Sequence, residues 1–192
     1  MTRNKYDLDP NSIVEQRLKE YAQNDKWIID FLGRSNICHI ATHWDEQPFI
    51  TPSTFFYRAD KHDIIFHSNI VGRVRANSER HSEVSFEISE YGKFLPSNVA
   101  LEFSLQYESV IGFGKIKIIA EDQAKHSALS KLIQKYFPNM EAGKEYRPIT
   151  EKELKQTSVY SITIESWSGK RNWEDQAEQS DKWPALPEEL LA

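Results

Sequence analysis

The spacing of apolar residues predicts two helices at the start of the chain. The second is the clearer one, because Asn24 is a favourable N-cap and the apolar stripe that follows ends near Gly33. The first is expected after Asp9-Pro10, with apolar residues at helical spacing: Ile13, Val14, Leu18 and Tyr21. Residues 1–35 would therefore be helical and pack on the domain that follows.

From residue 36 the pattern changes to short apolar runs and period-two alternation separated by turn residues, which is typical of β-strands. Glycines at 112 and 114 interrupt one long strand and indicate a bulge or bend. A loop is expected over 91–98 because it contains Gly92, Pro96 and Ser97. The expected strands cover 36–44, 49–57, 63–68, 83–88, 100–119 and 159–167.

Three further helical segments interrupt this run of strands. A short helix is expected over 72–80, and a longer one begins at Glu121-Asp122 and stops before Pro138. Thr150 to Glu153 has the pattern of a capping box that starts one or two helical turns.

Six strands in near-sequential order with few helices predict a mainly β fold with flanking helices. The expected architecture is a six-stranded antiparallel barrel over residues 36–172. Beyond it, residues 173–192 are acidic and polar and form a tail without a core of its own. The whole chain is interpreted as a single domain.

Composition narrows the classes of function. The 192 residues are 39% hydrophobic and 12% aromatic, so the chain is expected to fold. A net charge of −5 disfavours binding to nucleic acid, which requires a clustered basic face. The single cysteine, Cys38, is expected to be buried in a strand. No secretory signal and no membrane span is visible, so a cytoplasmic protein without a membrane partner is expected.

The strongest local signal for chemistry is the segment FHSNIVGR, Phe66 to Arg73. Here an apolar strand ends in polar residues and a Gly-Arg pair begins a helix. Exposed N–H groups at a helix N-terminus attract an anion, Ser68 and Asn69 can donate hydrogen bonds, and Arg73 can bind phosphate oxygens in a fork. By itself the segment is also compatible with an ordinary strand-to-helix turn and a surface arginine.

Two other clusters could contact a flat ring. Pro52, Ser53 and Thr54 lie on a neighbouring expected strand, and Ser109 precedes the two glycines. A flavin ring needs hydrogen-bond partners along its polar edge and an apolar wall. Residues near the end of the last strand offer an aromatic side chain and cations: Trp167, Lys170 and Arg171.

Taken in order, FHSNIVGR, YESVIGFGKIKII, the helix EDQAKHSALSKLIQKYF and the terminal WSGKR resemble the pyridoxamine 5'-phosphate oxidase-like FMN-binding split-barrel superfamily. The resemblance covers about residues 37–171. Within the superfamily it is similar to the nitroimidazole-resistance-type branch, in which a His-Ser pair and a Gly-Arg follow the third strand.

The resemblance implies a homodimer with FMN in two clefts between the subunits. In this implied site Pro52, Ser53 and Thr54 line the flavin, His67 and Ser68 lie near the ring and ribityl chain, and Arg73 binds the phosphate. Ser109 and Trp167 would close the site. Val74 stands where the family often has a second phosphate-binding lysine, and Lys170, Arg171 or Arg75 would have to compensate.

The function implied is that of an FMN-dependent oxidoreductase that reduces a small, electron-poor substrate such as a nitroaromatic compound. NAD(P)H is an electron donor that the resemblance allows, and His67 is the candidate catalytic residue. Three alternatives stay open: a non-catalytic flavin- or haem-binding protein with His67 as iron ligand, a pyridoxamine 5'-phosphate oxidase-related enzyme, and a structural dimer without a cofactor.

Two patterns argue against other sites. The vitamin B6 oxidases carry an Arg-x-His element past the final tryptophan, whereas this chain reads Lys170-Arg171-Asn172-Trp173, which disfavours pyridoxine phosphate as substrate. The histidines show neither HExxH nor any pairing with a CxxC motif, so no metal site is expected.

Overall fold

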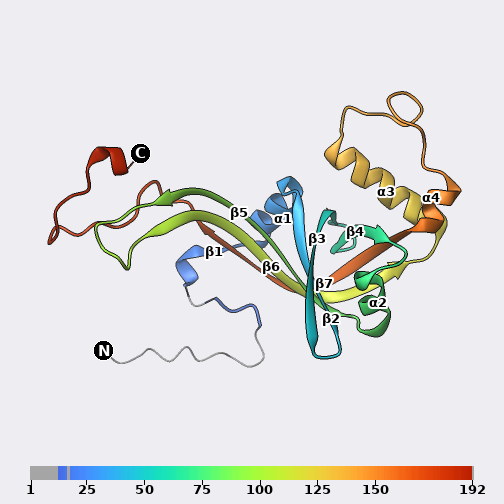
Figure 1. Cartoon of the computed structure of the whole chain (residues 1–192), viewed down its shortest axis with the longest axis horizontal. Helices are drawn as coiled ribbons and strands as arrows, with labels where there is room; N and C mark the ends of the chain where they lie inside the picture. Colours follow the sequence, from blue (N-terminus) through green and yellow to red (C-terminus); the bar gives the residue numbers. More distant parts are fainter. Residues whose placement is uncertain (1–12, 17, 192) are drawn as a thin grey trace.

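The computed structural model describes residues 13–16 and 18–191 (Figure 1). Four α-helices lie around the strands: α1 Asp25–Arg34, α2 Arg73–Arg80, α3 Asp122–Tyr136 and α4 Glu151–Gln156. Short 3-10 turns cover Lys19–Tyr21 and Glu188–Leu190. The strands are β1 Ala22–Gln23, β2 Ile37–Trp44, β3 Gln47–Arg58, β4 Asp63–Asn69, β5 Glu83–Leu95, β6 Ser104–Ile119 and β7 Thr157–Asn172.

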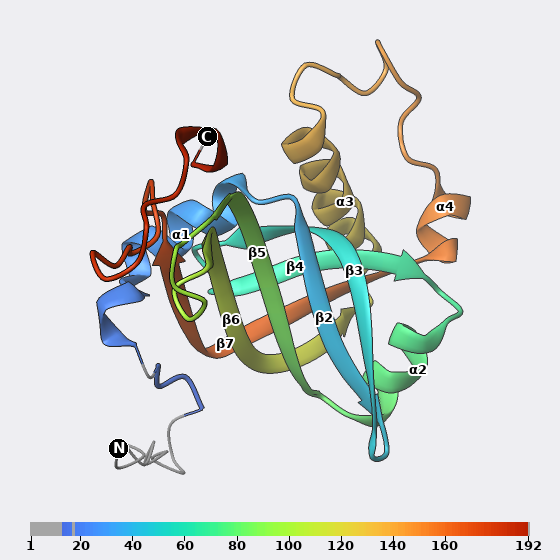
Figure 2. The ribbon, with the colours of Figure 1, turned by 60° about the vertical axis from the view of Figure 1, so that its left-hand side comes forward.

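Six of these strands form a closed antiparallel ring. The order is β7-β4-β3-β2-β5-β6, and β6 pairs back onto β7, while the short β1 adds to β7 outside the ring (Figure 2). The expected six-stranded antiparallel barrel is therefore confirmed. Closure removes the exposed strand edges that an open sheet of this size would present.

The paired strands of the ring differ greatly in the number of residues over which they pair. β6 and β7 pair over thirteen residues, whereas β3 and β4 pair only over Phe55–Arg58 with Asp63–Phe66. β2 and β5 pair only over His39–Ala41 with Ser85–Glu87. The ring is thus firmly joined on one side and opens on the other, which corresponds to a split barrel.

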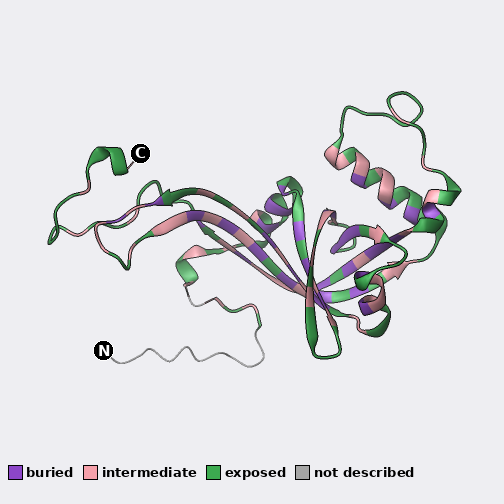
Figure 3. Cartoon of the chain, in the orientation of Figure 1, coloured by how far each residue is buried: buried purple, intermediate pink, exposed green. Residues whose placement is uncertain are grey.

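Burial follows the alternation of each strand (Figure 3). One cluster fills the barrel and is covered by α1, with Phe55, Phe66, Phe86 and Tyr160 among its largest side chains. A second cluster joins the outer face of the sheet to α3: Phe56, Ile65, Ala128, Leu132 and Val159. Neighbours in sequence, such as Ile65 and Phe66, therefore face different clusters, as the period of two requires.

Several expected helix starts are confirmed in detail. The Asn24 side chain accepts a hydrogen bond from Trp27 N at 3.0 Å and begins α1. Glu121 accepts bonds from two main-chain N–H groups at the start of α3. Thr150 and Glu153 form the reciprocal capping box of α4. Cys38 is fully buried in β2, as its apolar neighbours indicated.

The first expected helix is wrong over the described residues between 13 and 21. Its beginning, at residues 10–12, lies outside the described residues. Among the described residues between 13 and 21, the only helical segment is the 3-10 turn Lys19–Tyr21, and Leu18 at its start makes no side-chain cap. Immediately afterwards Ala22 and Gln23 pair with Lys170 and Gly169 of β7. This tertiary pairing holds the segment extended and overrides the weak helical periodicity.

The loop expected over 91–98 is also wrong in its first half, because β5 continues to Leu95. The register against β6 shifts between Tyr91 and Phe94, so Gly92 marks a bulge rather than the end of the strand. β7 likewise runs five residues past Trp167. Together β5, β6 and β7 extend away from the ring as a long arm (Figure 1).

The C-terminal tail lies along the end of this arm. Ser97 Oγ donates to Glu178 O at 2.6 Å, and Asn98 exchanges hydrogen bonds with Ser180 through both ends of its amide. None of residues 173–191 is buried. No helix among the described residues is long and apolar enough to cross a membrane.

Candidate functional site

The first set of expected site residues meets where β3 and β4 separate. Beyond the pair Phe55–Phe66, residues 52–54 of β3 pair only with β2, and residues 67–69 of β4 pair only with β7. The backbone therefore opens between Pro52–Thr54 and His67–Asn69. We call these residues, together with the turn and first helical residues up to Arg75, the β4–α2 corner.

The turn from β4 into α2 is fixed by its own polar groups. Val71 N donates to Asn69 Oδ1 at 2.9 Å, and Ile70 N donates to Gln156 O at 3.1 Å. Gly72 forms the N-cap of α2 and has φ 155°, a conformation that residues other than glycine rarely adopt. The Asn69 amide nitrogen thus stays available as a donor while its oxygen holds the turn.

The N-terminus of α2 differs from those of α1, α3 and α4. Each of those helices has a side-chain cap and an acidic residue in its first turn, whereas α2 has neither among the described residues. The first turn of α2 instead carries Arg73 and Arg75. Main-chain N–H groups and the positive end of the helix dipole are consequently left for an external anion.

The two arginines point to different surroundings. Arg75 Nε donates to Glu79 at 2.6 Å and its Nη1 donates to Ser158 Oγ at 3.1 Å. The guanidinium of Arg73 lies 4.7 Å from the centre of the Phe49 ring and 5.7 Å from that of Trp44. No ion pair found within the described residues includes Arg73, so its charge is free for an added anion.

Ser68 and His67 face opposite sides of β4. Ser68 Oγ lies 3.1 Å from the hydroxyl of Tyr160, whose ring stacks on Phe66 inside the barrel. His67 instead lines an outer pocket of about 310 Å³ with Leu129, Leu132 and Ile133 of α3 among its walls. Desolvation in this setting lowers the pKa of His67 below its ordinary value, so the imidazole is neutral at pH 7.

The remaining members of the first set have more limited roles. Val74 is 5% exposed and belongs to the barrel core, so its side chain cannot contact a bound cofactor. Only the main chain of Val74, in the first turn of α2, is left for a contact with a cofactor. Ser53 and Thr54 are half-buried and Pro52 is exposed, and the Ser53 hydroxyl donates to Thr54 O at 3.0 Å.

The second set lies on β6 and β7. Ser109 and Lys170 are direct partners across the two strands. Arg171 Nε donates to Glu108 Oε1 at 2.9 Å, and Arg34 contacts the same buried carboxylate. Trp167 Nε1 donates to Asp25 at 2.8 Å, and its ring packs against His62 and Tyr57. Arg171 is therefore already neutralised within the chain.

One chain does not bring the two sets together. Ser68 pairs with Ser158 on β7, and Trp167 lies nine residues farther along that strand. At about 3.3 Å per residue this separation is about 30 Å along the strand. A single flavin mononucleotide cannot span it, so a pocket that contains both sets requires two copies of the chain.

Several residues at the β4–α2 corner were missed as site residues. Tyr160 contacts Ser68, and Phe49 and Trp44 hold the Arg73 guanidinium. The alternation along β7 places Tyr160 inside the barrel, where a tyrosine hydroxyl needs a polar partner. That pattern is the signal by which Tyr160 could have been found. The contacts of Arg73 join residues more than twenty positions apart and had no local signal.

Comparisons with known proteins agree with this geometry. The flavocytochrome Anf3 from Azotobacter vinelandii is 21% identical, with a TM-score of 0.77 and coverage of 88% of this chain and 76% of that one. A FAD and heme binding protein from Mycobacterium smegmatis is 22% identical, with a TM-score of 0.73 and coverage of 83% and 76%. At these identities the likeness concerns the fold.

A candidate 5-nitroimidazole antibiotic resistance protein from Bacteroides thetaiotaomicron is also similar, at 18% identity and a TM-score of 0.65, with coverage of 78% of this chain and 86% of that one. No curated protein matches the chain. The family model described as pyridoxamine 5'-phosphate oxidase matches residues 24–171, which include the ring and both sets of site residues. The chain therefore belongs to the pyridoxamine 5'-phosphate oxidase family, as the resemblance in its sequence indicated.

Proposed function

We propose that the protein binds FMN at the β4–α2 corner and acts as an FMN-dependent oxidoreductase on a small, electron-poor substrate. The observation that carries the proposal is the start of α2. Among the residues that the structure describes, its N–H groups have no side-chain cap, its first turn has no acidic residue, and Arg73 has no ion pair. This combination binds a phosphate group by hydrogen bonds and charge. The family and the flavin named in its structural neighbours support a flavin as the source of that phosphate.

In this proposal each residue has a limited physical task. Arg73 and the N–H groups after Gly72 bind the phosphate, and the ring of Phe49 keeps the guanidinium in place. Ser53, Thr54 and Ser68 offer polar atoms at the opening between β3 and β4. FMN, when bound, supplies the transfer of hydride or electrons, and the protein orients the reacting partners.

The proposed site is completed by a second copy of the chain. Ser109, Trp167 and Lys170 are too far along the arm to reach the corner of their own subunit. Large apolar side chains are also exposed near the corner and on the neighbouring strands, including Ile50 at 71% and Val71 at 80%. Apolar exposure of this kind is typical of an association surface and supports a homodimer.

His67 is the proposed contact for substrate on the outer side of β4, opposite Ser68. Its lowered pKa keeps the ring neutral, so one ring nitrogen can accept a hydrogen bond while the other donates. Leucine and isoleucine side chains line the same pocket, and its two charged residues, Arg147 and Glu153, pair with each other, which favours an uncharged substrate. A nitroaromatic compound fits this description, with NAD(P)H as the proposed electron donor.

The test begins with the absorbance spectrum of the purified protein after incubation with FMN. Flavin bands that persist through gel filtration are expected. Arg73→Ala is expected to weaken FMN binding by about 1.5 to 3 kcal/mol, since it removes a charge-assisted contact. Arg73→Lys keeps the charge and loses the fork, so it should have an intermediate effect.

His126→Ala is the control, because His126 is exposed on α3. Titration by flavin fluorescence measures each affinity. Equal affinities for wild type, Arg73→Ala and His126→Ala would place the phosphate elsewhere and refute the assignment of the corner.

A second candidate function is the binding of haem without catalysis. It is favoured by the position of His67, whose neutral imidazole lies at a pocket with leucine and isoleucine walls and can act as a ligand to haem iron. One structural neighbour is named a FAD and heme binding protein, and another is named a flavocytochrome. A Soret band after addition of hemin that is lost in His67→Ala, without flavin bands, would select this function.

An oxidase of pyridoxamine 5'-phosphate is the least supported alternative. Such an enzyme must also hold the phosphate of its substrate, and the Arg171 side chain at the end of the arm is paired with Glu108. Turnover of pyridoxamine 5'-phosphate with release of hydrogen peroxide by the FMN-loaded protein would overturn this ranking.

A further inference from the structure

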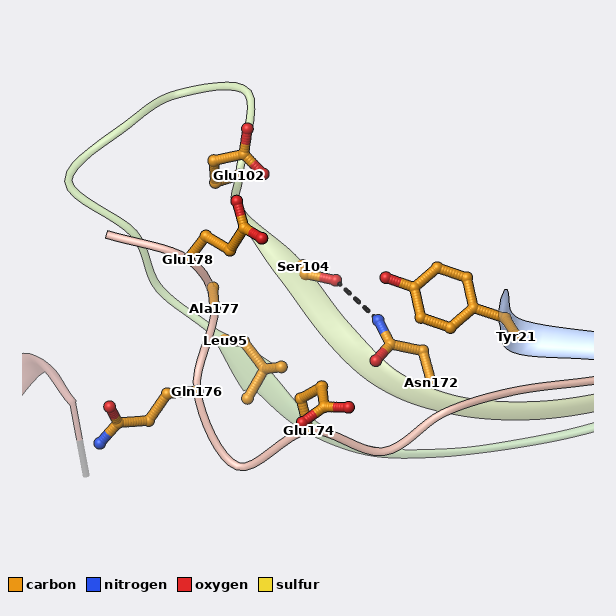
Figure 4. A pocket seen from close by; sticks show the side chains of 9 residues that line it. All are labelled: Tyr21, Leu95, Glu102, Ser104, Asn172, Glu174, Gln176, Ala177 and Glu178. Atoms are coloured by element: carbon orange, nitrogen blue, oxygen red, sulfur yellow. Dashed lines mark hydrogen bonds between the residues drawn. The ribbon is translucent and has the colours of Figure 1, made fainter. Parts of the chain in front are cut away.

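A cavity far from the β4–α2 corner lies at the end of the arm (Figure 4). Its volume is about 500 Å³. The ends of β5, β6 and β7 form its base, with Leu95, Ser104 and Asn172 facing the space, and the tail closes one side. We call this space the tail pocket.

The tail is held in place by hydrogen bonds to its main chain. Gln106 Nε2 donates to Glu174 O at 2.9 Å, and Ser97 Oγ donates to Glu178 O at 2.6 Å. Gln179 Nε2 donates to Pro96 O at 3.0 Å. Both glutamates are thus anchored through their carbonyls, and their carboxylates are left to face the tail pocket.

The charge of the tail pocket is strongly negative. Glu102, Glu174 and Glu178 line it, and no lysine or arginine is among its described lining residues. Within the part of the chain that the structure describes, none of these three carboxylates takes part in an ion pair. Lys170 lies over the ring of Tyr21 at 5.8 Å.

Asn172 provides an independent sign of a site for a polar ligand. The residue is 8% exposed, and its Oδ1 is buried without a hydrogen-bond partner among the described residues, while its Nδ2 reaches Ser104 Oγ at 3.4 Å. A buried amide oxygen without a donor costs free energy that a ligand N–H would recover. Figure 4 shows the Asn172 amide between Ser104 and the ring of Tyr21, at the inner side of the tail pocket.

The chemistry of the lining selects an organic cation. Three carboxylates and an unsatisfied amide oxygen all accept hydrogen bonds, so an anion is excluded by charge and a donor-rich ammonium is favoured. Among the described residues no group of three or more His, Cys, Asp or Glu side chains is arranged to hold a metal ion. The carboxylates are instead spread around the space, with Leu95 and Ala177 between them as apolar surface.

We propose that the tail pocket binds a linear aliphatic di- or polyamine. Its ammonium groups would pair with the separated carboxylates, one N–H would satisfy Asn172 Oδ1, and its methylene groups would lie against Leu95 and Ala177. None of its lining residues belongs to the β4–α2 corner or to the arm residues Ser109, Trp167 and Lys170, although Lys170 contacts the ring of Tyr21.

The experiment is calorimetric titration of the full chain with spermidine and with putrescine at fixed ionic strength. Saturable binding is expected, and Glu102→Gln with Glu178→Gln together should weaken it roughly tenfold or more. Asn172→Ala should weaken it roughly three- to tenfold without any change of net charge. Circular dichroism and thermal melting show whether each variant is folded.

The matched control is Glu46→Gln with Asp60→Asn, which removes the same charge at two exposed hairpin turns outside the tail pocket. It should retain wild-type affinity. The proposal is overturned if spermidine gives no saturable binding at millimolar concentration, or if the control weakens binding as much as the paired glutamate variant. Binding of magnesium chloride with the same dependence on the variants would show a metal site and exclude the amine assignment.

Discussion

His67 shows how one residue can belong to two environments. Its main chain is part of the β4–α2 corner, and its ring lies on the outer face of β4 beside α3. The residue is exposed, but the apolar side chains of α3 partly desolvate its ring, and this desolvation lowers the pKa of His67 in the folded state. The unfolded chain, whose histidine has an ordinary pKa near 6.5, therefore binds a proton more readily.

The pH dependence of stability follows from that difference. Because the folded-state pKa lies below the unfolded value, the free energy of unfolding should fall as the pH drops through 6.5 toward the folded pKa. His67→Gln removes this contribution, so its melting temperature should decline less between pH 7 and pH 5 than that of wild type. Differential scanning calorimetry at both pH values checks this, with His126→Gln as the control. Parallel declines for wild type and His67→Gln would contradict the assigned environment.

Among single residues, the sequence predicted the role of those that carry a local signal. The Gly-Arg pair at a helix start indicated an anion site, and the structure leaves that helix start uncapped. The placement of Arg73 on Phe49 and Trp44 could not be predicted, because it depends on the hairpin of β2 and β3 folding over α2. The burial of Val74 follows from the same packing and from no motif.

At the scale of elements, glycine decides where strands can cross closely. The register of β6 against β7 shifts between Phe113 and Gly114. A Cβ atom on Gly114 would lie 2.0 Å from the carbonyl oxygen of Thr163, so the backbone must move to admit it. The long strand predicted with glycines at 112 and 114 is confirmed as a bent and bulged one.

Gly114→Ala should therefore destabilise the protein by about 1 to 3 kcal/mol through overpacking. Gly33→Ala is the matched control, because Gly33 lies in α1 and an added Cβ atom there has no other atom within 4 Å. That substitution should stabilise by about 0.5 to 1 kcal/mol, because alanine favours a helix. Urea unfolding measures both, and a Gly114→Ala variant as stable as wild type would show that β6 and β7 do not approach so closely.

The elements that were predicted correctly carry their own start and stop residues, as with Asn24, Glu121 and Thr150. The errors concern segments whose conformation depends on a distant partner. Residues 22–23 are extended because they pair with β7, and β5 passes Gly92 because β6 continues beside it. Neither partner can be identified from the local pattern.

At the scale of the whole molecule, the separation of the two residue sets has a testable consequence. If each proposed flavin pocket takes Arg73 from one subunit and Lys170 from the other, a heterodimer of Arg73→Ala and Lys170→Ala chains contains one intact pocket and one doubly altered pocket. Random association of equal amounts then leaves about one quarter of the pockets intact.

The two variants should each bind FMN weakly alone and recover about one quarter of the high-affinity sites after mixing, unfolding and joint refolding. Fluorescence titration counts the sites, and each variant refolded alone is the control. A mixture that binds no better than its components would show that both residues act within one subunit, or that Lys170 has no part in binding.

Closure of the ring also bears on how the chain is made. The final ladder joins Asp63 of β4 to Thr163 of β7, residues one hundred positions apart. During synthesis β2 to β6 therefore emerge before the strand that seals them, and the edge of β4 stays open until β7 has left the ribosome. A nascent chain paused within α3 would expose that edge and the apolar inner face of the sheet, which makes this interval the one in which a chaperone is most needed.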